Sequence, residues 1–336
     1  MKTVIFDRCG EPADVLAVRE VNSPGLRAGE VLVEMRASPV NPSDLLFIRG
    51  EYTALPRLPA VPGFEGVGVV TQGMGLLGRR LVGTRVSVIG GDEGHWREQS
   101  VATAGQVIPL PRLLSDEQAA MFFVNPATAL TIIRSVLRVP KGAWVMQSAA
   151  NSALGRMVIR MGKYFGFRTL NLVRRDELAD ELYTLGADAV VTFDAEKQAA
   201  EELPRQLTKA TGRGEASFAM DCVGGKTGTA MIGCLSPRGH LVVYGTLSHE
   251  PILLPSRQLM RTGARISGFW LSQAMKETGL LGKLRLVREI VKLMRLGVLT
   301  SDVSEQFPLA RVVEAVQAAE QPGRGGKVLL RMGAMR

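Results

Sequence analysis

The chain has 336 residues, 46% hydrophobic and 22% charged, which excludes extended disorder and predicts more than one domain. It has no run of about 18 consecutive apolar residues, which excludes a membrane-spanning helix of the usual kind. The net charge is +9, and because residues 1–121 hold 12 basic and 14 acidic residues, the excess lies in residues 122–336. This excess indicates either a solvated surface or an anionic cofactor or substrate.

The first 120 residues contain short strand-like segments separated by glycine and proline. Examples are residues 2–6, 30–35, 66–70 and 84–88. Short strands with frequent turn signals are typical of a small barrel or an irregular β domain. Because the first segment begins at residue 2, we expect no targeting segment before it.

After residue 140 the pattern changes to alternating strands and helices. The sequence predicts strands at 143–147, 169–173, 189–193, 217–220 and 240–244, and helices at 154–165, 176–185, 196–209 and 226–235. Such alternation predicts a doubly wound parallel sheet, so the fold class is α/β. A strand at 265–271 closes this block, a helical pattern covers 284–294, and a final strand is expected at 326–330.

The cysteines and histidines give no metal or disulfide signal. Cys9, Cys222 and Cys234 form no CxxC pair, so we expect neither a disulfide nor a structural zinc site, and a reducing cytoplasm is the natural location. The histidines, His95, His240 and His249, are scattered. They are interpreted as structural or surface residues.

The turn after the strand at 143–147 resembles a dinucleotide-binding turn. Ala150, Ser152 and Gly155 occupy the three glycine positions of GxGxxG, with Asn151, Ala153 and Leu154 between them. Small residues between a strand and a helix let the backbone approach a pyrophosphate at the helix N-terminus. The alternative is an ordinary tight turn.

The end of the next strand favours one nicotinamide cofactor over the other. An acidic residue there usually selects NAD, but this strand ends in Arg174, Arg175 and Asp176. Two guanidinium groups suit a 2′-phosphate, so NADPH is predicted. Asp176 either belongs to this site or caps the following helix.

Several separated blocks resemble the medium-chain dehydrogenase/reductase superfamily, and within it the zinc-free 2-enoyl thioester reductases. The blocks are Asn-Pro-Ser-Asp at 41–44, Gly-Glu-Tyr at 50–52, Val-Pro-Gly-Phe-Glu-Gly at 61–66, Asn-Pro-Ala-Thr-Ala at 125–129, Asp-Cys-Val-Gly-Gly at 221–225 and Gly-Phe-Trp-Leu-Ser-Gln at 268–273. The resemblance implies a GroES-like catalytic domain (1–121), a Rossmann domain that binds NADP (122–272) and a C-terminal return to the catalytic domain (273–336). Cofactor and substrate are then expected between the domains.

The resemblance also implies that zinc is absent. Asn41 and Phe64 stand where zinc-dependent members carry a cysteine and a histidine. Neither an amide nor a phenyl ring is a credible zinc ligand.

Tyr52 is the predicted catalytic acid. Reduction of an enoyl thioester needs a proton at Cα, and an ordinary tyrosine, with a pKa of about 10, is protonated at neutral pH. Tyr52 also stands where the resembling reductases carry their catalytic tyrosine. The alternative is a loop tyrosine that only packs. Asn41, Ser43 and Asp44 could orient the substrate, but capping of a helix after Pro42 is preferred for Ser43 and Asp44.

Further cofactor contacts follow from the resemblance, residue by residue. Asn125 matches an asparagine near the nicotinamide, and Lys327 matches a C-terminal lysine near the cofactor. The other matched segments are the loop Tyr244, Gly245, Thr246 and Leu247 and the run Phe269, Trp270 and Leu271. For the aromatic pair, packing at a sheet edge is an alternative that is compatible with a cofactor role.

The sequence thus predicts NADPH-dependent reduction of the 2,3 double bond of an enoyl thioester carried by CoA or acyl carrier protein. The alternative is an NADPH:quinone or other activated-alkene reductase. RNA binding is disfavoured because no RNA-binding motif is recognised. We expect neither a nucleic acid nor a membrane as partner, but a homodimer formed through the edge strand at 265–271.

Overall fold

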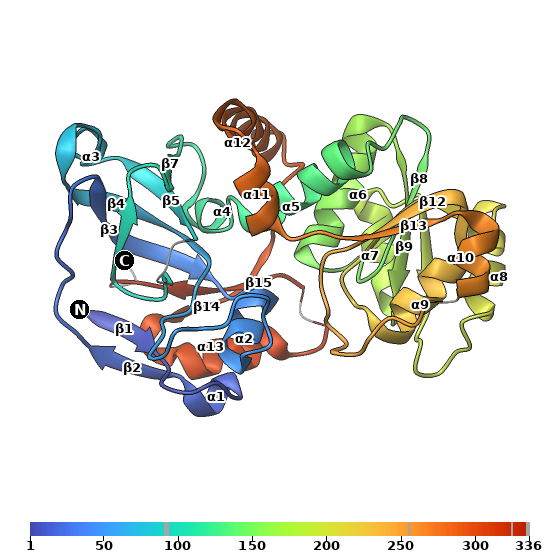
Figure 1. The fold of residues 1–336 in the computed structure, drawn as a ribbon, viewed down its shortest axis with the longest axis horizontal. Coiled ribbons are helices and arrows are strands. Elements are labelled where there is room, and N and C mark those ends of the chain that lie inside the picture. The colour runs from blue at the N-terminus through green and yellow to red at the C-terminus, as the bar shows by residue number, and fades with distance from the viewer. Residues whose placement is uncertain (91–93, 255, 324, 334–336) are drawn as a thin grey trace. The chain divides into compact units, whose positions relative to one another are not determined.

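The computed structural model describes residues 1–90, 94–254, 256–323 and 325–333, and it divides the chain into two compact units (Figure 1). Unit 1 comprises Met1–Val124 and Ser301–Arg336, and unit 2 comprises Asn125–Thr300. The predicted α/β fold class is confirmed: one unit holds a six-stranded parallel sheet with helices, and the other a mixed sheet.

Unit 1 is built on a mixed sheet in the order β14-β15-β3-β4-β5-β7, with β6 also paired to β3, and on a separate pair, β1-β2. The strands are β1 (Lys2–Ile5), β2 (Ala17–Glu20), β3 (Glu30–Pro39), β4 (Glu65–Gly73), β5 (Arg85–Ile89), β6 (Gln99–Thr103), β7 (Val107–Pro109), β14 (Val303–Pro308) and β15 (Lys327–Arg331). The helices are α1 (Pro12–Val15), α2 (Pro42–Arg49), α3 (Gly75–Leu81), α4 (Asp116–Ala120), η3 (Leu309–Arg311) and α13 (Val312–Glu320).

The last strand ties the C-terminal segment into unit 1. β15 lies between β14, to which it is parallel, and β3, to which it is antiparallel. Val328 and Leu330 of β15 share one hydrophobic core with Val4 and Phe6 from the start of the chain and with Val312 and Val316 of α13. The sequence-based expectation that the tail returns to the first domain therefore holds for residues 301–333.

Unit 2 is a six-stranded parallel sheet in the order β10-β9-β8-β11-β12-β13. Its strands are β8 (Trp144–Gln147), β9 (Arg168–Val173), β10 (Ala189–Thr192), β11 (Ala216–Asp221), β12 (Leu235–Val243) and β13 (Arg265–Gly268). Its helices are α5 (Val124–Thr131, which starts at the boundary), η1 (Ile132–Val136), α6 (Ala153–Phe165), η2 (Asp176–Leu178), α7 (Ala179–Leu185), α8 (Glu202–Thr211), α9 (Gly225–Gly233), α10 (Ser256–Thr262), α11 (Leu271–Glu277) and α12 (Leu280–Arg295).

Helices cover both faces of the parallel sheet (Figure 1). One core cluster joins α8 and α9 to the sheet through Leu203, Leu207 and Met231. Another joins α6 and α7 to it through Ile159 and Leu182. With the helices on its faces, the sheet leaves the carboxyl ends of its strands and the loops that follow them for ligands.

Three local expectations differ from the structure. The predicted strand at 265–271 ends at Gly268, and Leu271 already begins α11. The predicted helix at 196–209 begins at Glu202, because residues before it form turns in which Asp194 accepts from the backbone N–H of Glu196. Asp176 does not cap the helix that follows β9: Arg175 has the N-cap position and Asp176 is the first residue of η2.

The domain limits also differ from those expected. The structure crosses between units at 124–125 and 300–301, rather than at 121–122 and 272–273. Residues 273–300 belong to unit 2 because α12 packs there: the Lys292 ammonium lies 5.7 Å from the centre of the Tyr164 ring, and Arg160 donates to the carbonyl of Thr300. Charge pattern alone does not reveal this packing. Of the helices described, none is long and apolar enough to cross a membrane.

Candidate active site

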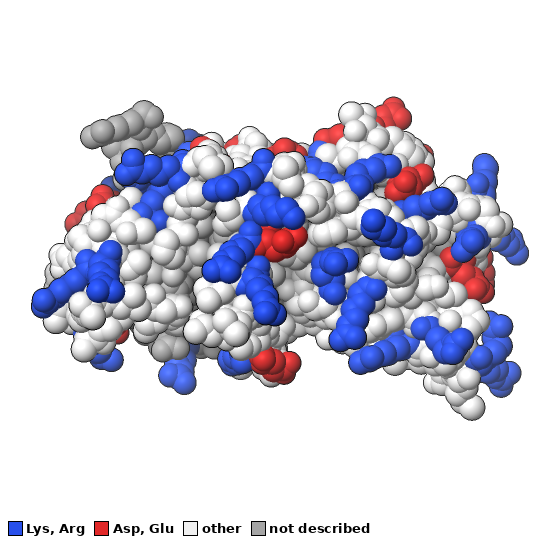
Figure 2. Space-filling model, turned by 90° about the horizontal axis from the view of Figure 1, so that it is seen from above, with Lys and Arg blue, Asp and Glu red and all other residues white. Residues whose placement is uncertain are grey.

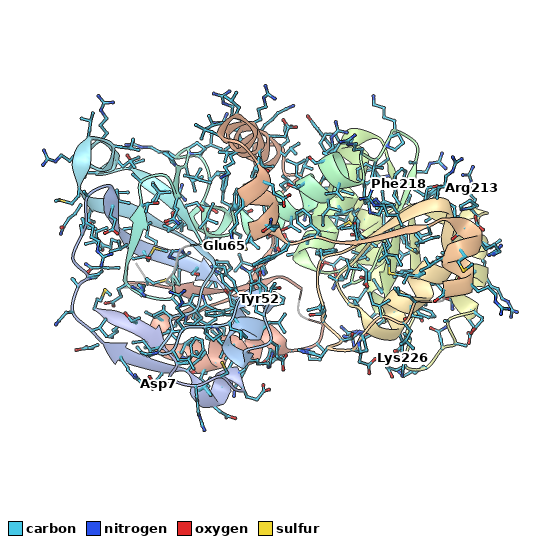
Figure 3. The ribbon with its side chains drawn as sticks, in the orientation of Figure 1. Asp7, Tyr52, Glu65, Arg213, Phe218 and Lys226 are labelled. Carbon is cyan, nitrogen blue, oxygen red and sulfur yellow. The ribbon has the colours of Figure 1, made fainter. Side chains whose placement is uncertain are left out.

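Tyr52 lies just after α2 in unit 1, where Figure 3 labels it. Helix α2 ends at Gly50, whose φ of 77° is left-handed and favours glycine. The Tyr52 ring is half-buried and lies 5.1 Å from the Phe64 ring at an angle of 38°. Phe64 in turn contacts Phe47, and Phe47 contacts Phe6. A row of aromatic rings therefore fixes the ring plane of the predicted acid.

Next to this row is a group of buried polar side chains: Asn41, Asp44, Glu65 and Lys327, named here the buried polar cluster. Lys327 Nζ donates to Asn41 Oδ1, and Asn41 Nδ2 donates to Glu65 Oε1 at 3.1 Å. Burial raises the pKa of Asp44 to about 7 and also raises that of Glu65, while backbone donors and the Lys327 ammonium oppose both shifts. The expected capping role of Asp44 is confirmed: its Oδ2 accepts from the backbone N–H of Asn41, the N-cap of α2.

These residues do not fit a zinc ion. The Asn41 amide is engaged by Lys327 and Glu65, and the Phe64 ring lies between two other rings. Across residues 1–90, 94–254, 256–323 and 325–333, no group of three His, Cys, Asp or Glu residues could hold a metal.

The histidines have local structural partners, as the sequence suggested. The ring of His95 hydrogen-bonds to Ser100 Oγ and to the carbonyl oxygen of Gly90, and burial lowers its pKa to about 4. His240 Nε2 hydrogen-bonds to Ser267 Oγ. Both rings hold backbone segments together.

The predicted dinucleotide turn joins β8 to α6 in unit 2. Ser152 is the N-cap of α6, and its Oγ accepts from the backbone N–H of Gly155 at 3.1 Å. A Cβ at Gly155 would lie 2.5 Å from the Ala150 carbonyl oxygen, so this third position requires glycine. Ser152 has an ordinary φ of −66°. The turn therefore tolerates serine at the second position while its third position keeps the helix close to the strand.

The neighbouring strands carry the predicted 2′-phosphate residues. Arg174 and Arg175 follow β9 and are exposed. At the end of β10, the neighbouring strand, a backbone bond from Glu196, the Lys197 ammonium and the charge of Arg174 lower the pKa of Asp194. Sequence reasoning did not consider Lys197, which lies 3.2 Å from Asp194 in an ion pair. This edge carries both signs of charge: the basic residues Arg174, Arg175 and Lys197 lie in the same two segments as Asp176, Glu177, Asp194 and Glu196.

A second buried polar group lies at the ends of β8 and β11. Ser148 Oγ donates to Asp221 Oδ1 at 2.5 Å and accepts from the backbone N–H of Cys222 at 3.1 Å. Asp221 also accepts from the backbone N–H groups of Val223 and Gly224. Sequence reasoning quoted this block as family resemblance but gave Asp221 no role. The signal that could have identified it is an acidic residue at the end of an apolar strand, before two glycines.

The other predicted cofactor segments lie along the same carboxyl edge. The loop after β12 is joined to the loop after β11: Leu247 N–H donates to the Cys222 carbonyl, and a Cβ at Gly245 would lie 2.9 Å from that oxygen. Phe269, after β13, donates to the Val243 carbonyl. Trp270 is the N-cap of α11, which Leu271 begins.

The structure thus brings most predicted cofactor residues to one edge of unit 2. Asn125 is the first residue of unit 2, within α5. Two predicted site residues lie in unit 1: Tyr52, and Lys327, which is only 4% exposed and belongs to the buried polar cluster. The roles of these residues in the site stay predictions.

On the face that Figure 2 draws, the basic side chains do not gather in one patch. Figure 2 shows Lys and Arg side chains spread over the drawn face. This distribution favours a solvated surface. The prediction of an anionic ligand therefore depends on the local residues Arg174 and Arg175 rather than on the net charge.

Comparison with known proteins places the chain in a family. Residues 27–112 match the alcohol dehydrogenase GroES-like domain, and residues 153–284 match the zinc-binding dehydrogenase family. The mitochondrial enoyl-(acyl-carrier-protein) reductase of Xenopus tropicalis is 33% identical, over 98% of this chain and 95% of that protein.

Solved structures agree with this placement. A Bacillus thuringiensis protein assigned as an NADPH:quinone reductase has a TM-score of 0.90 and 30% identity over 99% of both chains. Etr1p, from the mitochondrial 2-enoyl thioester reductase of Candida tropicalis, solved with NADP and crotonyl-CoA, has a TM-score of 0.83 and 26% identity over 98% of this chain and 99% of that one. The chain therefore belongs to the medium-chain dehydrogenase/reductase superfamily, in the family that includes the mitochondrial enoyl-(acyl-carrier-protein) reductases.

Proposed function

We propose that this protein reduces the 2,3 double bond of an enoyl thioester with NADPH. The observation that carries the proposal is Tyr52, a half-buried acid whose ring packs against the Phe64 ring. By the sequence resemblance, Phe64 stands where metal-dependent relatives carry a zinc ligand. The full-length similarity to enoyl-(acyl-carrier-protein) reductases supports the same reaction. The carrier of the acyl group, CoA or acyl carrier protein, stays open.

Reduction of the double bond adds a hydride to one carbon of the substrate and a proton to the other. Bound NADPH supplies a hydride for the substrate Cβ and becomes NADP⁺. The Tyr52 hydroxyl gives its proton to Cα, where the resulting enolate carries negative charge, and Tyr52 then recovers a proton from water. The aromatic row holds the ring during this transfer, so the acid is oriented before the substrate arrives.

The choice of NADPH depends on unit 2. Arg174 and Arg175 offer permanently charged donors at the end of β9, where a 2′-phosphate would lie. Etr1p, whose structure contains NADP, supports the same choice.

The second candidate is an NADPH:quinone reductase, favoured by the TM-score of 0.90 to a protein assigned that activity. A quinone takes its protons from water, so it needs no acid at Tyr52. The deciding experiment is NADPH oxidation with a series of short and long 2-enoyl-CoA thioesters beside a panel of quinones. Reduction of quinones but of no enoyl thioester would refute the proposed function.

We also propose a homodimer formed through β13, which stands at the end of the strand order of unit 2. An open sheet edge needs covering, and exposed apolar side chains lie in or near α10, including Leu253 and Met260. The Etr1p/Etr2p heterodimer supports a two-subunit assembly. Light scattering at micromolar concentration tests this, and a monomer would contradict it.

We further propose that the protein works without zinc in a reducing compartment such as the cytoplasm. All three cysteines are free thiols, and the Asn41 and Phe64 positions do not suit a metal. Elemental analysis of the purified protein tests the first point. About one zinc per chain, with activity lost to a chelator, would contradict it.

A further inference from the structure

The buried polar cluster joins three segments that are far apart in the sequence. Asn41 and Asp44 belong to the start of α2, Glu65 begins β4, and Lys327 begins β15. Their exposed fractions are 2%, 0%, 1% and 4%. Burying two carboxyl groups and an ammonium is costly unless each is paired and hydrogen-bonded. The contacts of each member therefore show what the cluster holds in place.

Glu65 holds the backbone where the chain leaves unit 1. Its Oε2 accepts from the N–H of Phe123 at 3.1 Å and from the N–H of Val124 at 2.9 Å. Unit 1 ends at Val124, and the next residue is Asn125, the predicted nicotinamide contact. The carboxylate thus fixes the chain immediately before that residue.

Asp44 holds the backbone beside the predicted acid. Its Oδ1 accepts from the N–H of Phe64 at 2.9 Å, while its Oδ2 accepts from the N–H of Asn41 at 2.8 Å. The Phe64 ring is the one that Tyr52 contacts. One carboxyl group therefore connects the N-terminus of α2 with the aromatic row.

Lys327 connects these two carboxyl groups. Its Nζ donates to Asn41 Oδ1 and lies 3.4 Å from the Val40 carbonyl oxygen. Asn41 in turn donates a hydrogen bond from its Nδ2 to Glu65 Oε1. The ammonium charge favours the ionised forms of both Asp44 and Glu65, against the effect of burial. Removing it would leave two buried carboxyl groups without a positive partner.

We propose that Lys327 is a positioning residue: through Asn41, Glu65 and Asp44 it fixes the backbone of Val124 and Phe64, and so the places of Asn125 and Tyr52. The proposal deepens the proposed function and depends on it for the roles of those two residues. It differs from the role that family resemblance suggests, in which Lys327 binds the cofactor. A misplacement of about 1 Å can lower turnover about 10²-fold.

The test compares Lys327→Met with Arg331→Met. Arg331 lies in the same strand and pairs with Glu117 outside the cluster, so it controls for loss of a basic residue from β15. We expect Lys327→Met to lower kcat for a 2-enoyl-CoA about 10²-fold, with the NADPH Kd and the substrate KM unchanged. Arg331→Met should keep the wild-type kcat. A raised NADPH Kd with an unchanged kcat at saturating NADPH would make Lys327 a cofactor ligand and overturn the proposal.

A double variant guards against loss of folding. With all groups ionised, the cluster carries two negative charges and one positive charge. The double variant Lys327→Met/Glu65→Gln removes one charge of each sign, so its cluster has the same net charge as that of the wild type. We expect this protein to fold and to keep a lowered kcat. A folded double variant with the wild-type kcat would contradict the positioning role.

Hydrogen exchange separates this proposal from the proposed function. The amides of Phe123 and Val124 should exchange faster in Lys327→Met than in Arg331→Met, whatever the substrate of the enzyme. If the wild type reduces no enoyl thioester, the proposed function fails, and this measurement still decides whether Lys327 positions the backbone. Equal exchange in the two variants would refute it.

Discussion

The two units hold buried carboxyl groups in different ways. In unit 2, Asp221 is bonded by the Ser148 hydroxyl and by two amides of its own loop, Val223 and Gly224. In unit 1, Asp44 and Glu65 accept hydrogen bonds from backbone N–H groups of distant segments. The positive charge of Lys327 lowers the pKa of both carboxyl groups against the effect of burial. The first arrangement joins the ends of two neighbouring strands of one sheet, β8 and β11, and shapes the loop after β11. The second connects a helix start, two strands and the backbone before unit 2, across residues 41 to 327. A substitution in unit 2 should therefore act locally, and one in unit 1 should act on geometry at a distance.

The largest effect should come from the acid itself. Tyr52→Phe keeps the ring against Phe64 but removes the proton, so turnover of a 2-enoyl-CoA should fall by about 10²–10⁴-fold. NADPH binding, which we assign to unit 2, should be unchanged in a fluorescence titration. Tyr164→Phe, a partly exposed tyrosine of α6, is the matched control. If Tyr52→Phe turns over as fast as the wild type, Tyr52 is not the acid.

The next effect tests the local arrangement in unit 2. Asp221→Ala leaves the amides of Val223 and Gly224 and the Ser148 hydroxyl without their acceptor, so the free energy of unfolding should fall by about 3 kcal/mol. Urea unfolding measures this, and the NADPH Kd should rise because the loop loses its shape. Ser217→Ala in the same strand removes an exposed hydroxyl bonded to Ser236 and should change little. Similar losses in both variants would show that Asp221 does not organise the loop.

A smaller effect is expected at the cofactor edge. Arg174→Ala removes a charge-assisted contact to a 2′-phosphate, worth about 1.5–3 kcal/mol, so the KM for NADPH should rise and that for NADH should barely change. Arg168→Ala, at the other end of β9, where Arg168 lies over the Trp144 ring, should alter neither. Equal use of NADPH and NADH by the wild type would contradict the assignment.

The smallest effect concerns pH and Asp44. Its pKa in the folded protein, about 7, lies above the ordinary value of 3.8, so its contribution to stability is complete below about pH 4 and is lost as the pH rises through 7. The slope is at most about 1.4 kcal/mol per pH unit. The difference in the free energy of unfolding between wild type and Asp44→Asn should therefore shrink between about pH 4 and pH 7 and stay constant above that range.

Asp7 provides the opposite case for this measurement. It is exposed in unit 1, where Figure 3 labels it, and its hydrogen bond from Arg19 lowers its pKa. Asp7→Asn should lose stability relative to wild type as the pH rises, with a small amplitude because the pair is solvated. A difference for Asp44→Asn that does not change with pH would show that this carboxyl group does not titrate in this range.

Periodicity and turn signals predicted most of the fold. Most of the predicted strands and the helix after the dinucleotide turn lie close to their predicted limits, because apolar patterns and breakers are local properties. The strands β6, β7 and β14 were not predicted, and β12 begins at Leu235 rather than at residue 240. Phe269 was placed in a strand because its segment is apolar, yet the chain turns there to begin α11. The return to unit 1 was placed at 273 because nothing in the sequence shows that α12 packs against Tyr164.

The candidate site was predicted unevenly for the same reason. The turn with Ser152 and Gly155 directly follows one predicted strand, and Arg174 and Arg175 directly follow the next. Their places at the carboxyl ends of the sheet strands could therefore be predicted from the order of elements along the chain. The buried polar cluster joins residues 41, 44, 65 and 327, and no local pattern predicts such a meeting. Lys327 was assigned to the cofactor by resemblance, whereas its structural neighbours are Asn41 and Val40.

The position of β15 has a consequence for synthesis of the protein. This strand lies between β14 and β3, and its first residue, Lys327, provides the positive charge of the buried polar cluster. Unit 2 is one continuous stretch, so a ribosome releases all of it before the last strand of unit 1 emerges. We expect the inserted unit to fold first, while the N-terminal segment waits with an unpaired edge at β3.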